Sequence, residues 1–279
     1  MPWIRQFLKD RLAVTGVLII LILILVAILA PYMAPTTSIY DVNLSKRLIP
    51  PCSEHIFGTD NQGRDILSRV IFGTRITIII AVIAVGSSLL IGVPMGLIAG
   101  YFDNWFSGII QRVSDVFLSL PQLILAIAIA SALEPGIKTA ILALSITYWP
   151  WFSRLVFAQT KSVKMSTFIE ATKALGASNF RIIIFHILPN VLTPIITRST
   201  IGMGYTILTA AALGFLGVGA QAPSPEWGLA LSEAREFLPK AWWFALFPGL
   251  AIFIVVMAFN MFGDGLRDVI DPRLRISRK

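Results

Sequence analysis

The residues with the clearest functional spacing lie in one basic, helix-forming stretch, FIEATKALGASNFRIIIFHILPN at 168–190, which stands between long apolar runs. Within it, Glu170, Ala171 and Gly176 are followed by the adjacent pair Leu188 and Pro189. These five residues include no nucleophile beside a base and no cluster of metal ligands. Their chemistry is therefore that of binding, and the stretch predicts a short helix that is presented to another molecule.

The start and the end of this short helix can both be predicted. Thr167 lies three residues before Glu170, the spacing of a capping box, in which a hydroxyl and a carboxylate each satisfy a free backbone amide at a helix start. We expect Glu170 to act mainly as this cap, with direct contact to a partner as a further role. Gly176 can end the helix in a left-handed conformation. One helical face is apolar and consists of Phe168, Ala171 and Leu175. An apolar face on a polar segment is typical of a helix that binds in a groove.

The composition places this segment in a membrane protein. Hydrophobic residues make up 56% of the chain and charged residues 14%, whereas about 25% of the residues in an average soluble domain are charged. Six segments lack Asp, Glu, Lys and Arg altogether: 12–40, 76–102, 116–133, 139–153, 199–225 and 241–263. Because roughly 20 apolar residues cross a bilayer as a helix, we expect an all-α fold with six transmembrane helices, the fourth continuing beyond Arg154.

Lys and Arg residues set the expected orientation, because positive loops stay in the cytoplasm. They concentrate in the N-terminus, in the loop after the fourth span and in the C-terminal tail. The first apolar run is too long for a secretory signal, so we expect it to be a retained helix. The expected organisation begins with a cytoplasmic N-terminus at 1–12, a first span at 13–34 and an external segment with an interfacial helix at 35–75. A five-span core at 76–266 follows and contains a cytoplasmic loop at 159–190. A cytoplasmic tail at 267–279 ends the chain. The net charge of +8 then indicates contact with anionic lipid and no binding of nucleic acid.

The stretch at 168–190 resembles the signature loop of ABC-importer permeases, in which Glu-Ala-Ala and a later Gly precede a Leu-Pro pair. Thr172 replaces the second Ala, and His186 stands where the general pattern has an apolar residue. The His-Ile-Leu-Pro-Asn ending is similar to that of the dipeptide, oligopeptide and nickel importers. Further segments resemble the same family: Gly-Thr-Asp-Asn-Gln-Gly-Arg-Asp at 58–65, Pro-Glu-Trp-Gly at 225–228, and 259–273, together with Arg112, Asp115 and Pro121.

The resemblance implies a type I ABC-importer permease fold and a transport subunit that is not an enzyme. The helix with Glu170, Ala171 and Gly176 would be a cytoplasmic coupling helix that seats in an ATP-hydrolysing subunit, and Leu188 and Pro189 close its motif. The implied assembly lies in the cell membrane and contains a homologous permease chain, two ATP-binding subunits and an extracytoplasmic substrate-binding protein. ATP and Mg would bind to the partner subunits, because this chain lacks a Gly-x-x-x-x-Gly-Lys-Ser/Thr motif and needs no cofactor of its own.

Two other groups of residues have expected roles. Glu226 and Trp227 fall where the binding protein docks in the family that the chain resembles, and Trp is a frequent hot-spot residue. The alternative for Trp227 is a place in the aromatic belt at the membrane interface. Gly92, Gly96 and Gly100 recur every four residues and leave a smooth stripe for another helix, either in this chain or in a second permease.

Cysteine and histidine are too few for a structural metal site. With one Cys and two His in the sequence, no internal disulfide and no zinc cluster are possible. Cys52 lies in the external segment. We expect His55 to be an ordinary loop residue, with a metal relay as the alternative, and His186 to form hydrogen bonds at the cytoplasmic interface.

A secondary transporter or a channel subunit that is not driven by ATP is the alternative function. Such proteins place ionisable residues within the membrane, whereas Asp115 and Arg198 are predicted near the ends of spans.

The substrate remains open between a nickel or metal chelate and a di- or oligopeptide. Peptide-importing relatives often carry Glu where this chain has Ala210, and the pair Trp149 and Trp151 before Arg154 is similar to the nickel-type pattern. These residues favour nickel slightly.

Overall fold

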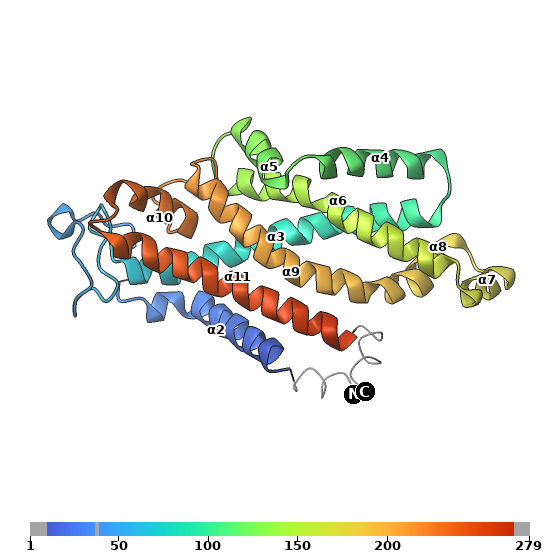
Figure 1. The fold of residues 1–279 in the computed structure, drawn as a ribbon, viewed down its shortest axis with the longest axis horizontal. Coiled ribbons are helices and arrows are strands. Elements are labelled where there is room, and N and C mark those ends of the chain that lie inside the picture. Colours follow the sequence, from blue (N-terminus) through green and yellow to red (C-terminus); the bar gives the residue numbers. More distant parts are fainter. Residues whose placement is uncertain (1–9, 37–38, 271–279) are drawn as a thin grey trace.

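The computed structural model describes residues 10–36 and 39–270, and these are nearly all helical (Figure 1). Within these ranges the only β feature is an isolated bridge between Thr59 and Asp65. The long helices are α2 (Arg11–Met33), α3 (Ile66–Tyr101), α4 (Trp105–Ser119), α5 (Gln122–Ser131), α6 (Ile137–Lys164), α9 (Leu188–Phe215) and α11 (Trp242–Ile270). The short ones are η1 (Leu44–Lys46), α7 (Thr167–Ala174), α8 (Asn179–Arg181), the π-helical η2 (Ile182–Ile187), α10 (Trp227–Ala234) and η3 (Arg235–Phe237). The predicted tail at 271–279 and most of the predicted N-terminus lie outside the described residues.

The described residues contain five helices long and apolar enough to cross a membrane, or six if the bent pair α4 and α5 is counted as one span. With this pair as the third span, the helices correspond to the six predicted spans, and three of them differ in form from the prediction. The third is broken by a 92° bend between Ser119 and Gln122. Pro121 lies in this bend, and the bend has a local cause, because proline lacks an N–H and disfavours a helical residue before it.

The second and fifth spans begin earlier than the apolar runs suggest. α3 starts at Ile66, where Asp65 accepts a 2.8 Å hydrogen bond from the Ser68 N–H, and it continues unbroken to Tyr101. The expected interfacial helix is thus the first part of the second span. Similarly, α8, η2 and α9 form one helical span over Asn179–Phe215. The predicted polar loop at 159–190 is therefore largely helical, because polar residues at the end of a long helix can extend beyond the membrane.

The glycine stripe of α3 packs against α6 of the same chain. A methyl group on Gly92 would lie 2.5 Å from the Trp149 carbonyl oxygen, and one on Gly96 would lie 2.6 Å from the Ser153 carbonyl oxygen. Gly100 approaches Thr160 in the same way. Of the two expected alternatives, contact within the chain is the one observed, and these glycines set the close approach of α3 and α6.

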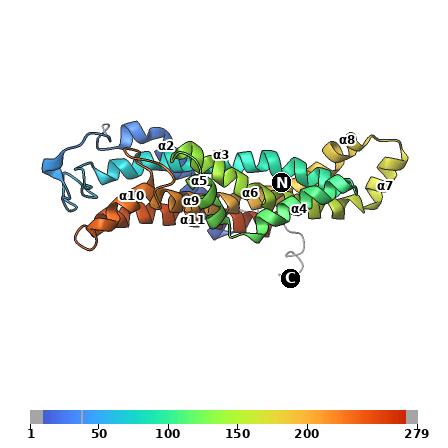
Figure 2. The same cartoon turned by 90° about the horizontal axis from the view of Figure 1, so that it is seen from above.

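The molecule is elongated, with different structures at its two ends. Figures 1 and 2 show α7 and α8 at one end, and α10 with the segment that precedes α3 at the other. In Figure 1, α4 and α5 form one long edge, and α2 lies beside α11 at the opposite edge.

Candidate functional site

Helix α7 projects at one end of the molecule and exposes the apolar face that the sequence predicts. Phe168 is 46% exposed and Leu175 is 88% exposed, and Ala171 is exposed as well. On the other face, Ile169 is 3% exposed and packs in a cluster with Tyr101, Ile182 and Ile187 and the partly buried Leu188. One side chain thus anchors α7 on the body of the molecule, while three apolar side chains face outward.

The C-terminal end of α7 is held in a fixed geometry. Gly176 has a φ of +82°, as the sequence predicts. Its N–H donates to the Lys173 carbonyl at 3.0 Å, and the Ala177 N–H donates to the Thr172 carbonyl at 3.3 Å. These two bonds make a Schellman motif, which satisfies carbonyl groups left free at a helix end. Pro189, by contrast, is exposed near the start of α9 and contributes to the helix that supports α7.

The predicted capping box at the other end of α7 is wrong. Ser166 is the N-cap, and Thr167 is already the first helical residue. The Ser166 hydroxyl donates backward to the Val163 carbonyl at 2.6 Å, so it does not cap α7 either. Glu170 is exposed in the first turn of α7, where a carboxylate is favoured by the helix dipole. Its carboxylate is therefore available to a partner.

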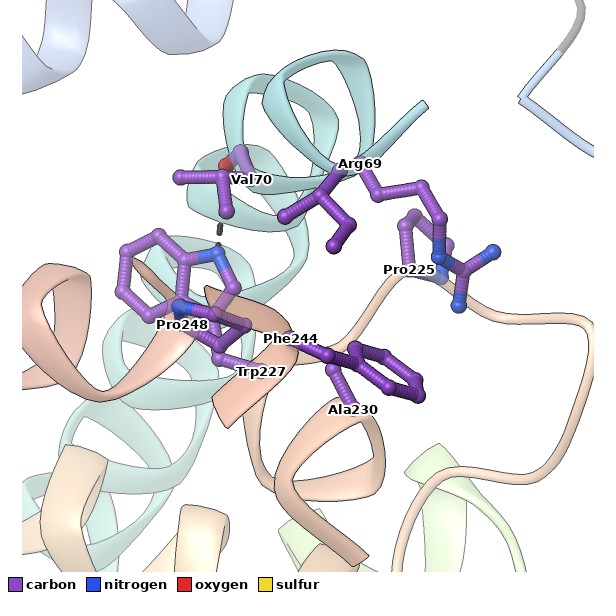
Figure 3. A pocket seen from close by; sticks show the side chains of 8 residues that line it. Arg69, Val70, Pro225, Trp227, Ala230, Phe244 and Pro248 are labelled. Carbon is purple, nitrogen blue, oxygen red and sulfur yellow. Dashed lines mark hydrogen bonds between the residues drawn. The ribbon is translucent and has the colours of Figure 1, made fainter. Parts of the chain in front are cut away.

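The structure corrects the expectation that Glu226 and Trp227 contact a docked protein. Trp227 is 1% exposed, and Figure 3 shows its indole directed at α3, where Nε1 donates to the Val70 carbonyl at 3.1 Å. Glu226 is 3% exposed and caps α10 by accepting hydrogen bonds from the N–H groups of Gly228 and Leu229 at 2.9 and 2.8 Å. Burial raises the pKa of Glu226 to about 7. Both side chains lie inside the end of the molecule that carries α10, so neither offers a surface for docking.

A network of buried charges holds the segment that precedes α3 to α3 and α10. Asp60 accepts a 2.6 Å bond from Arg64 Nε, and Arg64 Nη2 lies 3.0 Å from a carboxylate oxygen of Glu233. Arg69 lies 3.6 Å from the same Asp60 carboxylate and donates to the Ser224 carbonyl at 2.9 Å. From the sequence, residues 58–65 were related only to a family, and this network was not predicted. The charged residues at 60, 64 and 69, closely spaced in an apolar chain, were the signal for it.

His55, for which a metal relay was the alternative, lies beside a carboxylate of the same chain. His55 Nδ1 lies 2.9 Å from Asp65 Oδ1, so His55 supports the residue that caps α3. Cys52 is exposed and unpaired. Among the described residues no group of three potential ligands is close enough to hold a metal ion.

The bend between α4 and α5 forms one wall of an open pocket of about 440 Å³. The other walls come from α6 and α9. The polar and aromatic side chains that line the pocket include Gln122, Tyr148, Trp151, Arg198 and Tyr205. Arg198 was predicted near the end of a span. The helix that carries it runs from Asn179 to Phe215, so Arg198 lies near the middle of this helix, and its guanidinium carbon lies 4.8 Å from the centre of the Trp151 ring.

Comparison with known proteins identifies the family. Residues 92–276 match the model described as "Binding-protein-dependent transport system inner membrane component", and residues 2–51 match "N-terminal TM domain of oligopeptide transport permease C". The chain is a permease of the binding-protein-dependent ABC importers. This family assignment replaces the secondary transporter and the channel as alternatives, and it makes the chain a multi-pass membrane subunit that works with an ATPase and a substrate-binding protein.

Several curated relatives of this ABC permease are similar along nearly its whole length. The dipeptide transport system permease protein DppC of Alkalihalophilus pseudofirmus is 47% identical over 98% of this chain and 91% of the relative. The glutathione transport system permease protein GsiD of Pectobacterium atrosepticum is 40% identical over 98% and 92%. The probable D,D-dipeptide transport system permease protein DdpC of Escherichia coli is 40% identical over 94% and 88%.

A solved structure supports the fold. A chain from the inward-facing MetNI methionine ABC transporter aligns with a TM-score of 0.61 at 18% identity, over 74% of this permease and 98% of that chain. The expected type I permease fold is therefore confirmed.

Proposed function

We propose that this permease carries dipeptides or similarly short peptides across the membrane, and that ATP hydrolysis in separate subunits drives transport through α7. ATP and Mg bind to those subunits in this proposal. The observation that carries the coupling role is the exposed apolar face of α7, held at one side by the buried Ile169 and ended by the left-handed Gly176. A rigid, short helix with an apolar outer face is the structure that a groove on an ATPase can bind.

The substrate class is supported by the relatives and by the environment of three residues. The relatives described above are named for dipeptides, D,D-dipeptides and glutathione, and none of these names mentions nickel. Ala210, which favoured nickel from sequence, is buried in a cluster with Ile80 and Leu213 and does not line the open pocket. Trp149 contacts Phe117, and Trp151 lies under Arg198. These packing roles need no metal, so we replace the leaning toward nickel with a peptide substrate.

We also infer that a homologous permease chain covers the edge formed by α4 and α5. The open pocket lies there, and so does the ion pair between Arg154 and Asp115, whose atoms are 3.0 Å apart and whose side chains are 50% and 54% exposed. Exposed charges within a span are unfavourable against lipid, whereas a second permease would enclose both the ion pair and the pocket. The complete importer would then contain two permeases, two ATPase subunits and a binding protein at the outer end.

The proposal is tested by reconstituting the permease with its ATPase and binding-protein partners in vesicles. We expect ATP-dependent uptake of labelled L-alanyl-L-alanine and no ATP-dependent uptake of Ni²⁺. Uptake of Ni²⁺ without dipeptide uptake would refute the substrate class, and dipeptide uptake that is independent of ATP would refute the coupling.

The orientation is tested separately by thiol labelling in a Cys52→Ser background. Lys173 in α7 and Lys240 near the start of α11 are both exposed and lie near opposite ends of the molecule. We expect Lys240→Cys to react with an impermeant reagent added outside the cell, and Lys173→Cys to react only after the membrane is opened. The reverse pattern would invert the topology.

A further inference from the structure

The pocket at the bend between α4 and α5 has a cation, Arg198, on a helix long and apolar enough to span the membrane. Arg198 is partly exposed there. Within the described part of the chain, no ion pair joins a carboxylate to its guanidinium. The guanidinium carbon lies over the Trp151 ring, 4.8 Å from the ring centre. A charge on a membrane-spanning helix is costly unless it is matched by an opposite charge or by water. The geometry therefore calls for an anion that arrives from outside the chain.

The surroundings of Arg198 suit a small carboxylate. None of the residues that line the pocket is acidic. Tyr148 and Tyr205 stack with ring centroids 6.3 Å apart, and both also line the pocket, where their hydroxyl groups can donate hydrogen bonds. Gln122 adds an amide from the first position of α5. The volume of about 440 Å³ lies within the range of about 300–1,000 Å³ typical of small-molecule sites.

We infer that this pocket is a subsite of the transport pathway that receives the terminal carboxylate of the peptide, with Arg198 as its cationic partner. The inference rests on the proposed peptide substrate and names the residue that would recognise it inside the permease. Arg is well suited to this role because its planar guanidinium binds a carboxylate through two parallel hydrogen bonds. Trp151 holds the guanidinium by a cation–π contact and leaves its edges free for the ligand. The pocket offers nothing acidic for the amino group of the peptide, which would be bound outside this chain.

The test uses the complete importer in nanodiscs without the binding protein, so that selection by that protein does not enter. Ser119 lines the pocket and is exposed, so Ser119→Cys in a Cys52→Ser background serves as a reporter of occupancy. Its rate of alkylation is measured by mass spectrometry against increasing L-alanyl-L-alanine or its C-terminal amide. We expect the free acid to protect the thiol at a concentration at least about tenfold lower than the amide, the ratio that one charge-assisted hydrogen bond provides.

Variants of Arg198 then test whether this residue causes the preference for the free acid over the amide. Arg198→Gln is expected to remove the difference between acid and amide, and Arg198→Lys to keep most of it. Arg75→Gln, which removes an exposed charge of α3 outside the pocket, should leave the difference unchanged. A purely structural role for Arg198 would change assembly or overall protection, but it would not change the ratio between acid and amide.

Two results overturn the inference and separate it from the proposed function. If wild-type vesicles take up dipeptide but the reporter shows no preference for the acid, or if Arg198→Gln keeps that preference, the subsite is wrong and the proposed function stands. If wild-type vesicles take up no dipeptide, the proposed function fails and the subsite fails with it.

Discussion

Replacing Gly176 by Asp is expected to separate the ATPase from the permease while leaving the membrane helices intact. The φ of +82° at this position costs a residue with a Cβ atom roughly 1 kcal/mol. A Cβ atom there would have no atom of the described chain within 4 Å, apart from those of the two neighbouring residues. The intrachain cost is therefore only this backbone strain, which is small beside the total stability of a folded protein. Any larger effect must come from a molecule that contacts the end of α7, where Asp adds bulk and a charge.

Gly217 provides a matched control for this substitution. It has a φ of +80°, also lies in open space, and follows α9 at the other end of the molecule. Gly176→Asp and Gly217→Asp should lower the melting temperature of the purified permease by similar small amounts. Only Gly176→Asp should reduce the amount of ATPase that copurifies with the permease, with a parallel loss of ATP-dependent uptake in vesicles.

Two results would refute this reasoning. Normal uptake by Gly176→Asp with the ATPase fully retained would mean that α7 does not couple the subunits. Equal loss of the ATPase in both glycine variants would mean that backbone strain, and not a contact at α7, causes the effect.

Three further predictions concern other parts of the structure. Gly96→Ala should destabilise the permease by about 1–3 kcal/mol, because its methyl group would crowd α6. Gly86→Ala on the same helix places a methyl group with nothing within 4 Å, so it should be neutral or stabilising. Equal melting temperatures for the two variants would contradict the packing role of Gly96. Glu226 has a folded-state pKa raised from 4.5 to about 7 by burial, so its contribution to stability is fully present below about pH 4.5 and is lost as the pH rises through 7, by about 3 kcal/mol in total. Glu226→Gln should therefore flatten the decline in melting temperature between pH 5 and pH 8, and an unchanged slope would show that Glu226 does not titrate there. Glu170→Ala should change the melting temperature little, because it removes only an interaction with the helix dipole of about 0.3–1 kcal/mol. The same variant should retain less ATPase during purification. A lower melting temperature with full ATPase retention would make Glu170 a purely structural residue.

Local features of the fold could be predicted from sequence because their causes are local. The apolar runs gave the six spans, since the bilayer requires a minimum length of apolar helix whatever the neighbours. Gly176 and the exposed face of α7 followed from helical spacing. The capping box failed by one position, because Ser166 and Thr167 are both suitable cap residues and the end of α6 decides where α7 begins.

The features that could not be predicted depend on contacts between distant segments. The burial of Trp227 depends on the Val70 carbonyl of another helix, and the docking role failed for that reason. The position of Arg198 along its helix depends on how far that helix extends toward α7, and an apolar run cannot show this. Pro121 was noted in the sequence only for its resemblance to the family, and the open pocket at the bend around it also needs side chains from α6 and α9.

The most direct measurement is photo-crosslinking from Leu175 in the assembled importer. A photoreactive residue at position 175, which is 88% exposed on α7, should form an adduct with the ATPase subunit. The same residue at Leu216, which is 52% exposed at the other end of the molecule, should form no ATPase adduct. An active importer in which position 175 gives no adduct with the ATPase, or in which position 216 gives as much, would contradict the role of α7 as the helix through which ATP hydrolysis drives this permease.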